Sequence, residues 1–275
     1  MIVAAVGTLG AMRIDLTGRT AFVSGSTQGI GRAIAAGLAR SGATTVINGR
    51  SERSVEEALR ALRDDHPDAR LHGVAADVAT AEGARAVTEA HPGVDILVNN
   101  LGIFEARPAL EIDDAEWRRY FEVNVLSGIR LARLYLPGMV DRGWGRVQFI
   151  ASDSAVAIPA EMVHYGMSKT ALLAVSRGYA KAVAGTGVTV NTVLAGPTHT
   201  GGVEDFVADM VGDELPWDER QRRFMAEHRP NSLLRRLIEP EEIANMVVYL
   251  GSEHASATTG GALRVDGGYV DAILP

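Results

Sequence analysis

Two side chains able to hold and move a proton stand four residues apart in this chain. Tyr165 and Lys169 lie in a run rich in Ala, Leu and Met that continues to Ala184, so on a helix they share one face. A free tyrosine titrates near pH ~10, and a neighbouring ammonium favours the phenolate and lowers that pKa. The pair could then exchange a proton with an alcohol or a ketone. Any amphipathic helix can carry such a pair by chance, so the rest of the chain has to decide.

A serine upstream completes a candidate catalytic group. Ser152 follows the mostly apolar run of residues 147–150, which predicts a buried strand. A hydroxyl at the carboxyl end of a strand can hydrogen-bond a substrate oxygen. We therefore expect a strand and the helix after it to bring Ser152, Tyr165 and Lys169 together.

The pattern near the start of the chain is typical of a phosphate-binding loop. Residues 20–24 predict a strand, residues 25–31 read Gly-Ser-Thr-Gln-Gly-Ile-Gly, and residues 32–40 predict a helix. Glycines let the backbone approach a pyrophosphate closely, and a helix start presents unpaired N–H groups and a positive dipole end. A tight strand-to-helix turn is the alternative, but the place of the loop in the first β-α unit favours dinucleotide binding.

The end of the second predicted strand bears on the choice of cofactor. Residues 44–47 predict this strand, and Asn48, Gly49 and Arg50 follow it without a carboxylate among them. In dinucleotide-binding folds an acid here holds the ribose 2′-hydroxyl, whereas an arginine accommodates a 2′-phosphate. Arg50 therefore predicts NADP(H) as the preferred cofactor, with NAD(H) as the alternative if Arg50 is only a solvated surface residue.

Strands and helices keep alternating through the middle of the chain. Residues 71–75 and 95–100 predict the third and fourth strands, and residues 82–90 predict a helix between them. Asp77 and Val78 follow the third strand, where the carboxylate could meet an adenine amino group or cap the helix. This alternation predicts an α/β fold with a doubly wound parallel sheet.

Later segments supply another polar candidate and a candidate lid. Residues 114–137 predict a long helix in which Asn124 has apolar neighbours, so its amide needs partners. This amide could be catalytic, or it could bond its own helix backbone and kink it. Thr198 and Thr200 follow a sixth strand at residues 188–194, and residues 201–236 are polar, helix-like and irregular, as expected of a lid over a substrate.

Composition and charge limit the class of protein. The 275 residues suit one large α/β domain, and 47% hydrophobic residues can fill its core. A formal net charge of −7 argues against nucleic acid or an anionic membrane as the main partner and favours small molecules. The chain has no cysteine, which excludes disulfides and thiolate metal sites, and we predict no metal site. No apolar run reaches the roughly 18 residues of a membrane helix.

The first residues stand apart from this pattern. Residues 1–12 are apolar, but the first positive side chain, Arg13, follows them, which is the wrong polarity for a signal peptide. We predict an N-terminal extension over residues 1–14, with Met12 as an alternative start, and a single domain over residues 15–275 with its lid at about 198–236. The absence of cysteine fits a reducing compartment, so we expect a cytoplasmic protein.

The motifs together resemble the short-chain dehydrogenase/reductase family from about Asp15 to Tyr269. The glycine loop, Asp77 and the run Asn-Asn-Leu-Gly at residues 99–102 occur in the order that the family shows. Within the family the chain is most similar to the 3-oxoacyl-carrier-protein reductase-like members. Four residues match the family's catalytic set: Asn124, Ser152, Tyr165 and Lys169.

The resemblance implies a role for each of these four residues. Tyr165 would exchange the proton with the substrate oxygen, while Lys169 would lower the tyrosine pKa and bind the nicotinamide ribose. Ser152 would polarise the carbonyl, and Asn124 would hold a water that relays protons to the lysine. Because Tyr165 fills the acid-base role, we expect the nearby histidines, His164 and His199, to line the pocket or lie on the surface. Ser154 is a second candidate serine whose spacing from the tyrosine fits the family less well.

The family's fold is a seven-stranded parallel sheet flanked by helices, a three-layer α/β/α Rossmann fold that is usually assembled as a tetramer. Its pattern departs here at Leu101, where alanine is usual, at Ser24, where threonine is usual, and at residues 195–197, where its Pro-Gly is altered. The motifs and the resemblance assign these cofactor contacts: Gly25, Ser26, Gln28, Gly29, Ile30, Gly31, Arg50, Asp77, Val78, Asn100, Gly102, Tyr165, Lys169, Thr198 and Thr200.

We therefore expect an NADP(H)-preferring oxidoreductase that interconverts a secondary alcohol and a ketone, with 3-oxoacyl thioester reduction as a specific candidate. A catalytically silent nucleotide sensor or scaffold on the same fold is the alternative, and the four catalytic residue types argue against it. Six arginines could form a basic rim for an acidic carrier protein or coenzyme A, or simply a solvated helix face: Arg220, Arg222, Arg223, Arg229, Arg235 and Arg236.

The predicted helix that carries Tyr165 also bears on assembly. It is apolar around more of its circumference than one sheet contact can use. The surplus predicts a homo-oligomer with two-fold symmetry, a dimer or a tetramer, built partly from this helix and the helix of residues 114–137.

Overall fold

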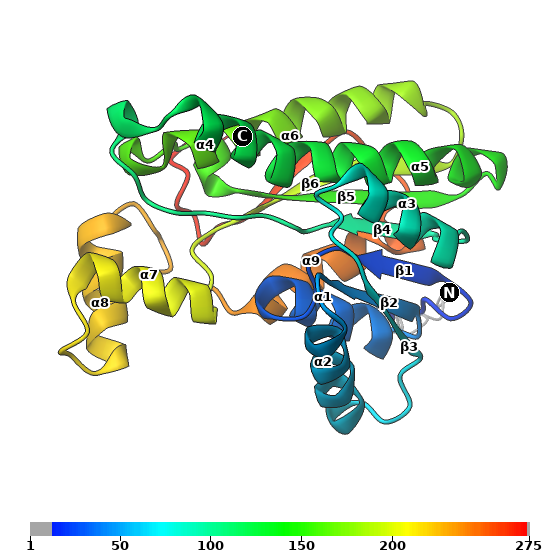
Figure 1. Ribbon diagram of the computed structural model, residues 1–275, viewed down its shortest axis with the longest axis horizontal. Coiled ribbons are helices and arrows are strands. Elements are labelled where there is room, and N and C mark those ends of the chain that lie inside the picture. Colours follow the sequence, from blue (N-terminus) through cyan, green and yellow to red (C-terminus); the bar gives the residue numbers. More distant parts are fainter. Residues whose placement is uncertain (1–12, 274–275) are drawn as a thin grey trace, which may run out of the picture.

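The computed structural model describes residues 13–273, which form a seven-stranded parallel sheet between two layers of helices (Figure 1). This confirms the predicted fold class. The strand order is β3-β2-β1-β4-β5-β6-β7, so the chain changes direction across the sheet between β1 and β4, where open α/β sheets bind ligands. The strands are β1 (Thr20–Val23), β2 (Thr44–Gly49), β3 (Leu71–Ala75), β4 (Ile96–Asn99), β5 (Gly145–Ser152), β6 (Val188–Ala195) and β7 (Ala262–Val265).

Helices cover both faces of the sheet and bury it (Figure 1). One face packs against α1 (Gly29–Arg40), α2 (Glu52–Asp65) and α9 (Pro240–Leu250), and the other against α3 (Ala81–Ala90), α5 (Ser127–Asp141) and α6 (Val163–Ala182). Because both faces are covered, every residue of β5 and of β6 is buried, as expected for the inner strands of a parallel sheet.

Three element boundaries differ from the prediction in ways that matter for function. Helix α1 begins at Gly29, inside the glycine loop, and β5 continues to Ser152, so this serine is the last residue of its strand. The long helix predicted at residues 114–137 consists of α4 (Asp114–Phe121), a π-helical turn (Glu122–Leu126) and α5, which continues past the predicted end to Asp141. π-helical turns inside α-helices are frequent at functional sites.

The segment predicted as an irregular lid forms two helices, α7 (Gly201–Val211) and α8 (Trp217–His228), that project beside the sheet (Figure 1). They have a small apolar cluster of their own, made of Val207, Val211, Phe224, Met225 and Leu237. The predicted extension falls almost wholly on residues 1–12, which lie outside the described residues. Between residues 13 and 273, no helix is long and apolar enough to cross a membrane.

Candidate active site

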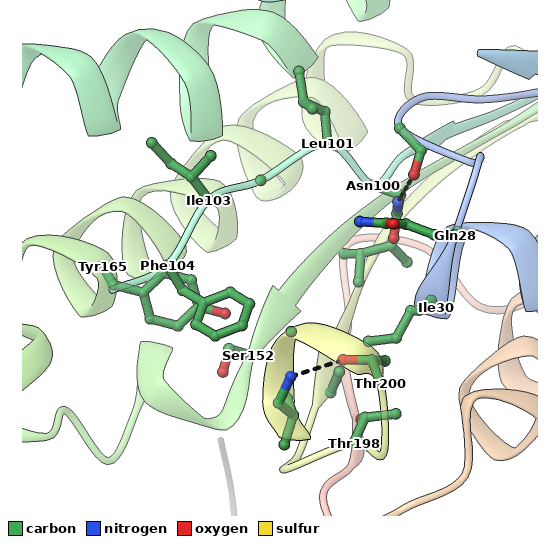
Figure 2. A pocket seen from close by; sticks show the side chains of 18 of the residues that line it. Gln28, Ile30, Asn100, Leu101, Ile103, Phe104, Ser152, Tyr165, Thr198 and Thr200 are labelled. Atoms are coloured by element: carbon green, nitrogen blue, oxygen red, sulfur yellow. Dashed lines mark hydrogen bonds between the residues drawn. The ribbon is translucent and has the colours of Figure 1, made fainter. Parts of the chain in front are cut away.

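A cavity of about 910 Å³ lies at the carboxyl ends of the central strands. Figure 2 shows Ser152, Tyr165 and Phe104 at one end of it and Gln28 and Asn100 at the other. We call the first the tyrosine end and the second the glycine-loop end. The two ends are built from different elements, so each is described separately.

Strand β5 and helix α6 build the tyrosine end. Ser152 closes β5, Tyr165 stands in the first turn of α6, and Lys169 follows one turn later on the same face. The Ser152 hydroxyl donates a hydrogen bond of 2.7 Å to Asp153 Oδ1. Lys169 Nζ donates to the Ile150 carbonyl at 2.9 Å and lies 5.5 Å from the centre of the Tyr165 ring. The structure thus brings the three predicted residues to one cavity.

The ionisation of Tyr165 differs from the prediction. Its enclosed environment raises the pKa of Tyr165 above its usual value, because desolvation of the phenolate outweighs the opposing hydrogen bond from Ser152. Burial also lowers the pKa of Lys169 to about 8. The expected lowering of the tyrosine pKa by the lysine is therefore wrong for the protein alone. Near neutral pH Tyr165 is a protonated phenol, which is the form that can donate a proton to a carbonyl oxygen.

Asn124 lies in the π-helical turn and is buried. Its Oδ1 accepts from the backbone N–H of Ile103 at 2.8 Å, and its Nδ2 donates to the Ile103 carbonyl and to Ser168 Oγ at 3.0 and 2.9 Å. These bonds tie the segment after β4 to helix α6. Asn124 therefore holds α6 and the segment after β4 together next to the tyrosine end. Its side chain forms no hydrogen bond with the backbone of its own helix among the described residues.

The glycine-loop end is shaped to receive a phosphate. Helix α1 has no side-chain hydrogen bond at its N-cap, Gln28, so no side chain of the cap occupies its first N–H groups. A Cβ on Gly31 would lie 2.4 Å from the Gly25 carbonyl oxygen and 2.5 Å from Asn100 Nδ2, so this close packing requires glycine. The bare helix start leaves N–H groups free for an anion, which fits the pyrophosphate of a dinucleotide.

Three polar residues hold this loop in place, and two of them, Ser24 and Asn48, are buried. Asn100 Nδ2 donates to the carbonyls of Ser24 and Gly25, both at 3.0 Å, while Ser24 Oγ accepts from the N–H groups of Asn100 and Leu101. Asn48 Oδ1 accepts from the Gly25 N–H at 3.2 Å. Its Nδ2 donates to the carbonyls of Val74, in β3, and Ala76, just after it. Sequence reasoning missed this role of Asn48, although an amide at the end of an apolar strand is a signal that it needs partners.

Fourteen of the fifteen predicted cofactor contacts line the cavity, and Ser26 does not. The Ser26 hydroxyl donates to the Val23 carbonyl and accepts from the Asn48 N–H, so it is buried inside the loop, and Thr27 lines the cavity in its place. The residues that do line it are Gly25, Gln28, Gly29, Ile30, Gly31, Arg50, Asp77, Val78, Asn100, Gly102, Tyr165, Lys169, Thr198 and Thr200.

Arg50 and Asp77 lie at the rim, at the ends of the neighbouring strands β2 and β3. Both side chains are exposed, so a ligand can reach them. Asp77 does not cap α3, since the Thr80 side chain accepts from the Gly83 N–H there. Asp77 Oδ1 instead accepts from the Ala79 N–H at 3.1 Å and keeps its second oxygen for a ligand.

Two threonines close the cavity from the side of α7. Thr200 caps this helix by accepting from the Val203 N–H, and a Cβ on Gly29 would lie 3.3 Å from its methyl group (Figure 2). Thr198 is buried and donates to the Gly196 carbonyl at 2.8 Å. The altered Pro-Gly region thus still places both threonines beside the glycine loop.

The two histidines differ from each other in environment. His164 is fully buried with its ring 4.0 Å from that of Tyr120, and neither ring nitrogen has a hydrogen-bond partner among the described residues. The prediction that it lines the pocket or the surface is therefore wrong, because its place is in the core. His199 does not line the cavity; it stacks on Trp217 at 4.9 Å, and its Nε2 lies 2.7 Å from Glu204 Oε1.

Comparison with known proteins agrees with this geometry. A family model described as enoyl-(acyl carrier protein) reductase matches residues 25–270. The chain therefore belongs to the short-chain dehydrogenase/reductase family, and it is an oxidoreductase of that family.

Relatives at three levels of similarity show the range of the family. The chain is 49% identical over 264 residues to the uncharacterized oxidoreductase YvaG of Bacillus subtilis, covering 96% of this chain and all of that one. It is 32% identical to the 3-oxoacyl-[acyl-carrier-protein] reductase FabG of Aquifex aeolicus, over 94% of this chain and 99% of the relative. Its fold is similar to that of L-sorbose reductase from Gluconobacter frateurii, solved with NADPH and L-sorbose, with a TM-score of 0.88, 35% identity, and coverage of 95% and 100%.

Proposed function

We propose that the protein is an NADP(H)-preferring enzyme that interconverts a secondary alcohol and a ketone. One observation carries this proposal: a protonated phenol, a serine hydroxyl and a buried lysine share a cavity with a loop built to receive a pyrophosphate. Ser152, Tyr165 and Lys169 line the cavity and Asn124 supports them from behind it, so nothing supports the catalytically silent alternative.

In the direction of ketone reduction, the residues act as follows. A bound nicotinamide cofactor supplies the hydride. Tyr165 donates its proton to the carbonyl oxygen, and Lys169, whose ammonium lies near the ring, favours the phenolate that this transfer leaves. Ser152 turns its hydroxyl from Asp153 toward the substrate oxygen and orients the carbonyl. Strand β5 and helix α6 hold these groups in position before the reaction.

Preference for NADP(H) follows from Arg50. The exposed guanidinium at the end of β2 can pair with a 2′-phosphate, and no carboxylate follows this strand to accept hydrogen bonds from a 2′-hydroxyl. A hydrogen bond to a charged group contributes about 1.5–3 kcal/mol, which corresponds to a preference of roughly ten- to a hundredfold. The solved structure of L-sorbose reductase with NADPH supports the same choice.

The test compares kcat/KM for NADPH and NADH with a fixed ketone. We expect NADPH to be favoured, and Arg50→Asp to shrink or reverse that preference by about ten- to a hundredfold. Arg53→Asp is the matched control, because Arg53 is an exposed arginine of α2 outside the cavity lining. Equal or better kcat/KM with NADH in the unmodified protein would assign Arg50 to the solvated surface.

Reduction of 3-oxoacyl thioesters is the specific activity that the relative from Aquifex aeolicus suggests. Docking of an acidic carrier protein has weaker support, because the basic rim is partly neutralised within the chain. Arg223 pairs with Glu227, Arg236 pairs with Glu242, and Arg229 is buried. A small-molecule ketone or alcohol is therefore the substrate that we propose, with α7 and α8 as its lid and the cytoplasm as its location.

Assembly as a homo-oligomer is also part of the proposal. On α6, Ala171, Ala174 and Val175 remain partly or fully exposed, and Phe121 and Leu134 are 40% and 36% exposed on α4 and α5. These apolar side chains support a two-fold interface built from both helices, in a dimer or a tetramer. Light scattering at micromolar concentration should give a multiple of the chain mass, and a monomer mass would contradict this assembly.

A further inference from the structure

A buried acid lies directly beside the catalytic serine. Asp153 is 4% exposed, and its Oδ1 accepts three hydrogen bonds, from Ser152 Oγ at 2.7 Å, from the Ser154 N–H at 2.6 Å and from Ser154 Oγ at 3.3 Å. Its other oxygen, Oδ2, has no hydrogen-bond partner in the described part of the chain. A buried carboxylate oxygen without a donor is costly, so a donor on a ligand would stabilise it.

A buried cation faces the same cavity from the end of α8. Arg229 is 9% exposed, and its guanidinium lies 5.3 Å from the Phe224 ring centre and 5.6 Å from that of Tyr269. Among residues 13–273 its side chain donates only to the His228 carbonyl, at 2.6 Å, and forms no ion pair. A guanidinium has five N–H donors, so most of its hydrogen-bonding capacity is unused here.

These two residues differ from the other charged side chains of the cavity. Apart from Lys169, they are the charged lining residues that are buried. Solvent satisfies the others, since Arg50, Asp77, Arg119, Glu204 and Asp205 are all exposed. The pKa of the Asp153 carboxyl lies above its usual value, because burial outweighs the Ser152 hydrogen bond and the charge of Arg229, which both lower it.

Part of the cavity wall beside them is aromatic. Phe104 packs against Tyr165 with ring centres 6.2 Å apart and against Phe206 at the same distance, and Phe206 packs against Phe224 at 6.0 Å. Polar atoms in such surroundings gain most from a ligand that hydrogen-bonds them, because little water competes.

We propose that Asp153 and Arg229 form a substrate subsite that selects a polyhydroxy ketone carrying a carboxylate. This inference rests on the proposed function and names its substrate class. Asp153 adjoins Ser152, so the hydroxyl that donates to Oδ2 sits on a carbon next to the reacting carbonyl. Arg229 lies at the end of α8 and binds the carboxylate at the far end of the same molecule. Its guanidinium donates two parallel hydrogen bonds to that group.

Other substrate classes leave one or both groups unsatisfied. A simple ketone or a 3-oxoacyl thioester brings no hydroxyl to Asp153, and a neutral ketose brings no anion to Arg229. Leaving a buried polar group unpaired costs about 1–3 kcal/mol, or roughly five- to a hundredfold in kcat/KM for each group. The subsite therefore disfavours substrates that leave Asp153 or Arg229 without a hydrogen-bond partner.

Matched ketones test this directly with NADPH. L-sorbose and 5-keto-D-gluconate share one carbon chain and differ at the end far from the ketone, which is a hydroxymethyl group in the first and a carboxylate in the second. Hexan-2-one lacks both features, and acetoacetyl coenzyme A represents the thioesters. We expect kcat/KM to fall from 5-keto-D-gluconate to L-sorbose to hexan-2-one, by about tenfold or more at each step, with the thioester below the ketogluconate.

Two substitutions assign the effect to its residues. Arg229→Gln should lower the preference for 5-keto-D-gluconate over L-sorbose by about tenfold or more, and Arg229→Lys should retain part of it because the charge remains. Asp153→Asn should lower the ratio of L-sorbose to hexan-2-one, a ratio in which any shift of Ser152 cancels. Arg222→Gln is the control, since this exposed arginine of α8 lies outside the cavity lining and should leave both ratios unchanged. Thermal melts confirm that each variant folds.

The outcomes separate the two proposals. Turnover of any ketone without preference for the ketogluconate, a preference for the thioester, or unchanged ratios in Arg229→Gln and Arg229→Lys would overturn the subsite and leave the proposed function standing. NADPH binding, followed by fluorescence, without oxidation by any of the four compounds would overturn the proposed function and the subsite with it.

Discussion

The two ends of the cavity satisfy their polar atoms in opposite ways. At the glycine-loop end, Ser24, Asn48 and Asn100 spend their hydrogen bonds on the chain's own backbone and hold the loop in one shape. At the tyrosine end, Asp153 keeps an unpartnered oxygen, and Lys169 has a single carbonyl partner among the described residues. The hydrogen bonds that shape the first end are therefore complete without a ligand, whereas polar atoms of the second end still lack partners.

The largest expected effect is the loss of kcat/KM on a substitution at the tyrosine end that leaves the glycine-loop end unchanged. Tyr165→Phe removes the proton donor but little apolar contact, so kcat/KM for ketone reduction should fall by about 10³-fold while NADPH affinity stays within a few-fold. Steady-state kinetics and fluorescence titration with NADPH measure the two quantities. Substantial remaining turnover would show that Tyr165 is not the proton donor, and a loss of NADPH binding would show that the two ends are not independent.

A smaller effect concerns the free energy of unfolding, which the burial of the Lys169 ammonium lowers. Because the folded protein lowers the pKa of Lys169 to about 8 from its usual value of 10.5, the cost of burying the ammonium is complete below pH 8 and disappears as the pH rises toward 10.5. Lys169→Met removes this cost, less the hydrogen bond to Ile150, and should raise the free energy of unfolding at pH 7 by about 1–3 kcal/mol. Activity should fall as well, since we propose that Lys169 acts on both the cofactor and the tyrosine.

Denaturant unfolding of the wild type and of Lys169→Met at pH 7 and pH 10 measures this difference. The gap between the two proteins should narrow at pH 10, because the lysine of the folded wild type is then neutral and no longer carries the cost of a buried charge. A Lys169→Met variant that is less stable at pH 7 would mean that the bond to the Ile150 carbonyl contributes more than burial costs.

The smallest effect tests the glycine-loop end. A methyl group on Gly31 meets the Gly25 carbonyl oxygen at 2.4 Å, so Gly31→Ala forces the loop to shift and should weaken NADPH binding by about tenfold. Gly93→Ala is the control, since nothing lies within 4 Å of a Cβ at that position. An unchanged Kd for NADPH in Gly31→Ala would mean that the loop is less fixed than its hydrogen bonds indicate.

Local patterns in the sequence determined much of this protein. The strand-glycine-helix order of residues 20–40 predicted the phosphate loop, and the spacing of Tyr165 and Lys169 placed both on one face of a helix. Alternating strands and helices predicted the parallel sheet, and the family resemblance supplied the roles of the four catalytic residues. These features depend on neighbours within a few residues, so periodicity and turn chemistry can reveal them.

The tertiary structure alone decided where side chains point and which atoms stay unpaired. Ser26 turned into its own loop, His164 entered the core, and the pKa of Tyr165 rose because segments distant in sequence enclose it. Asp153 directly follows β5 and Arg229 directly follows α8, and only the packing of α7 and α8 beside the sheet brings both to one cavity. Burial and hydrogen-bond partners are sums over long-range contacts, which local spacing does not encode.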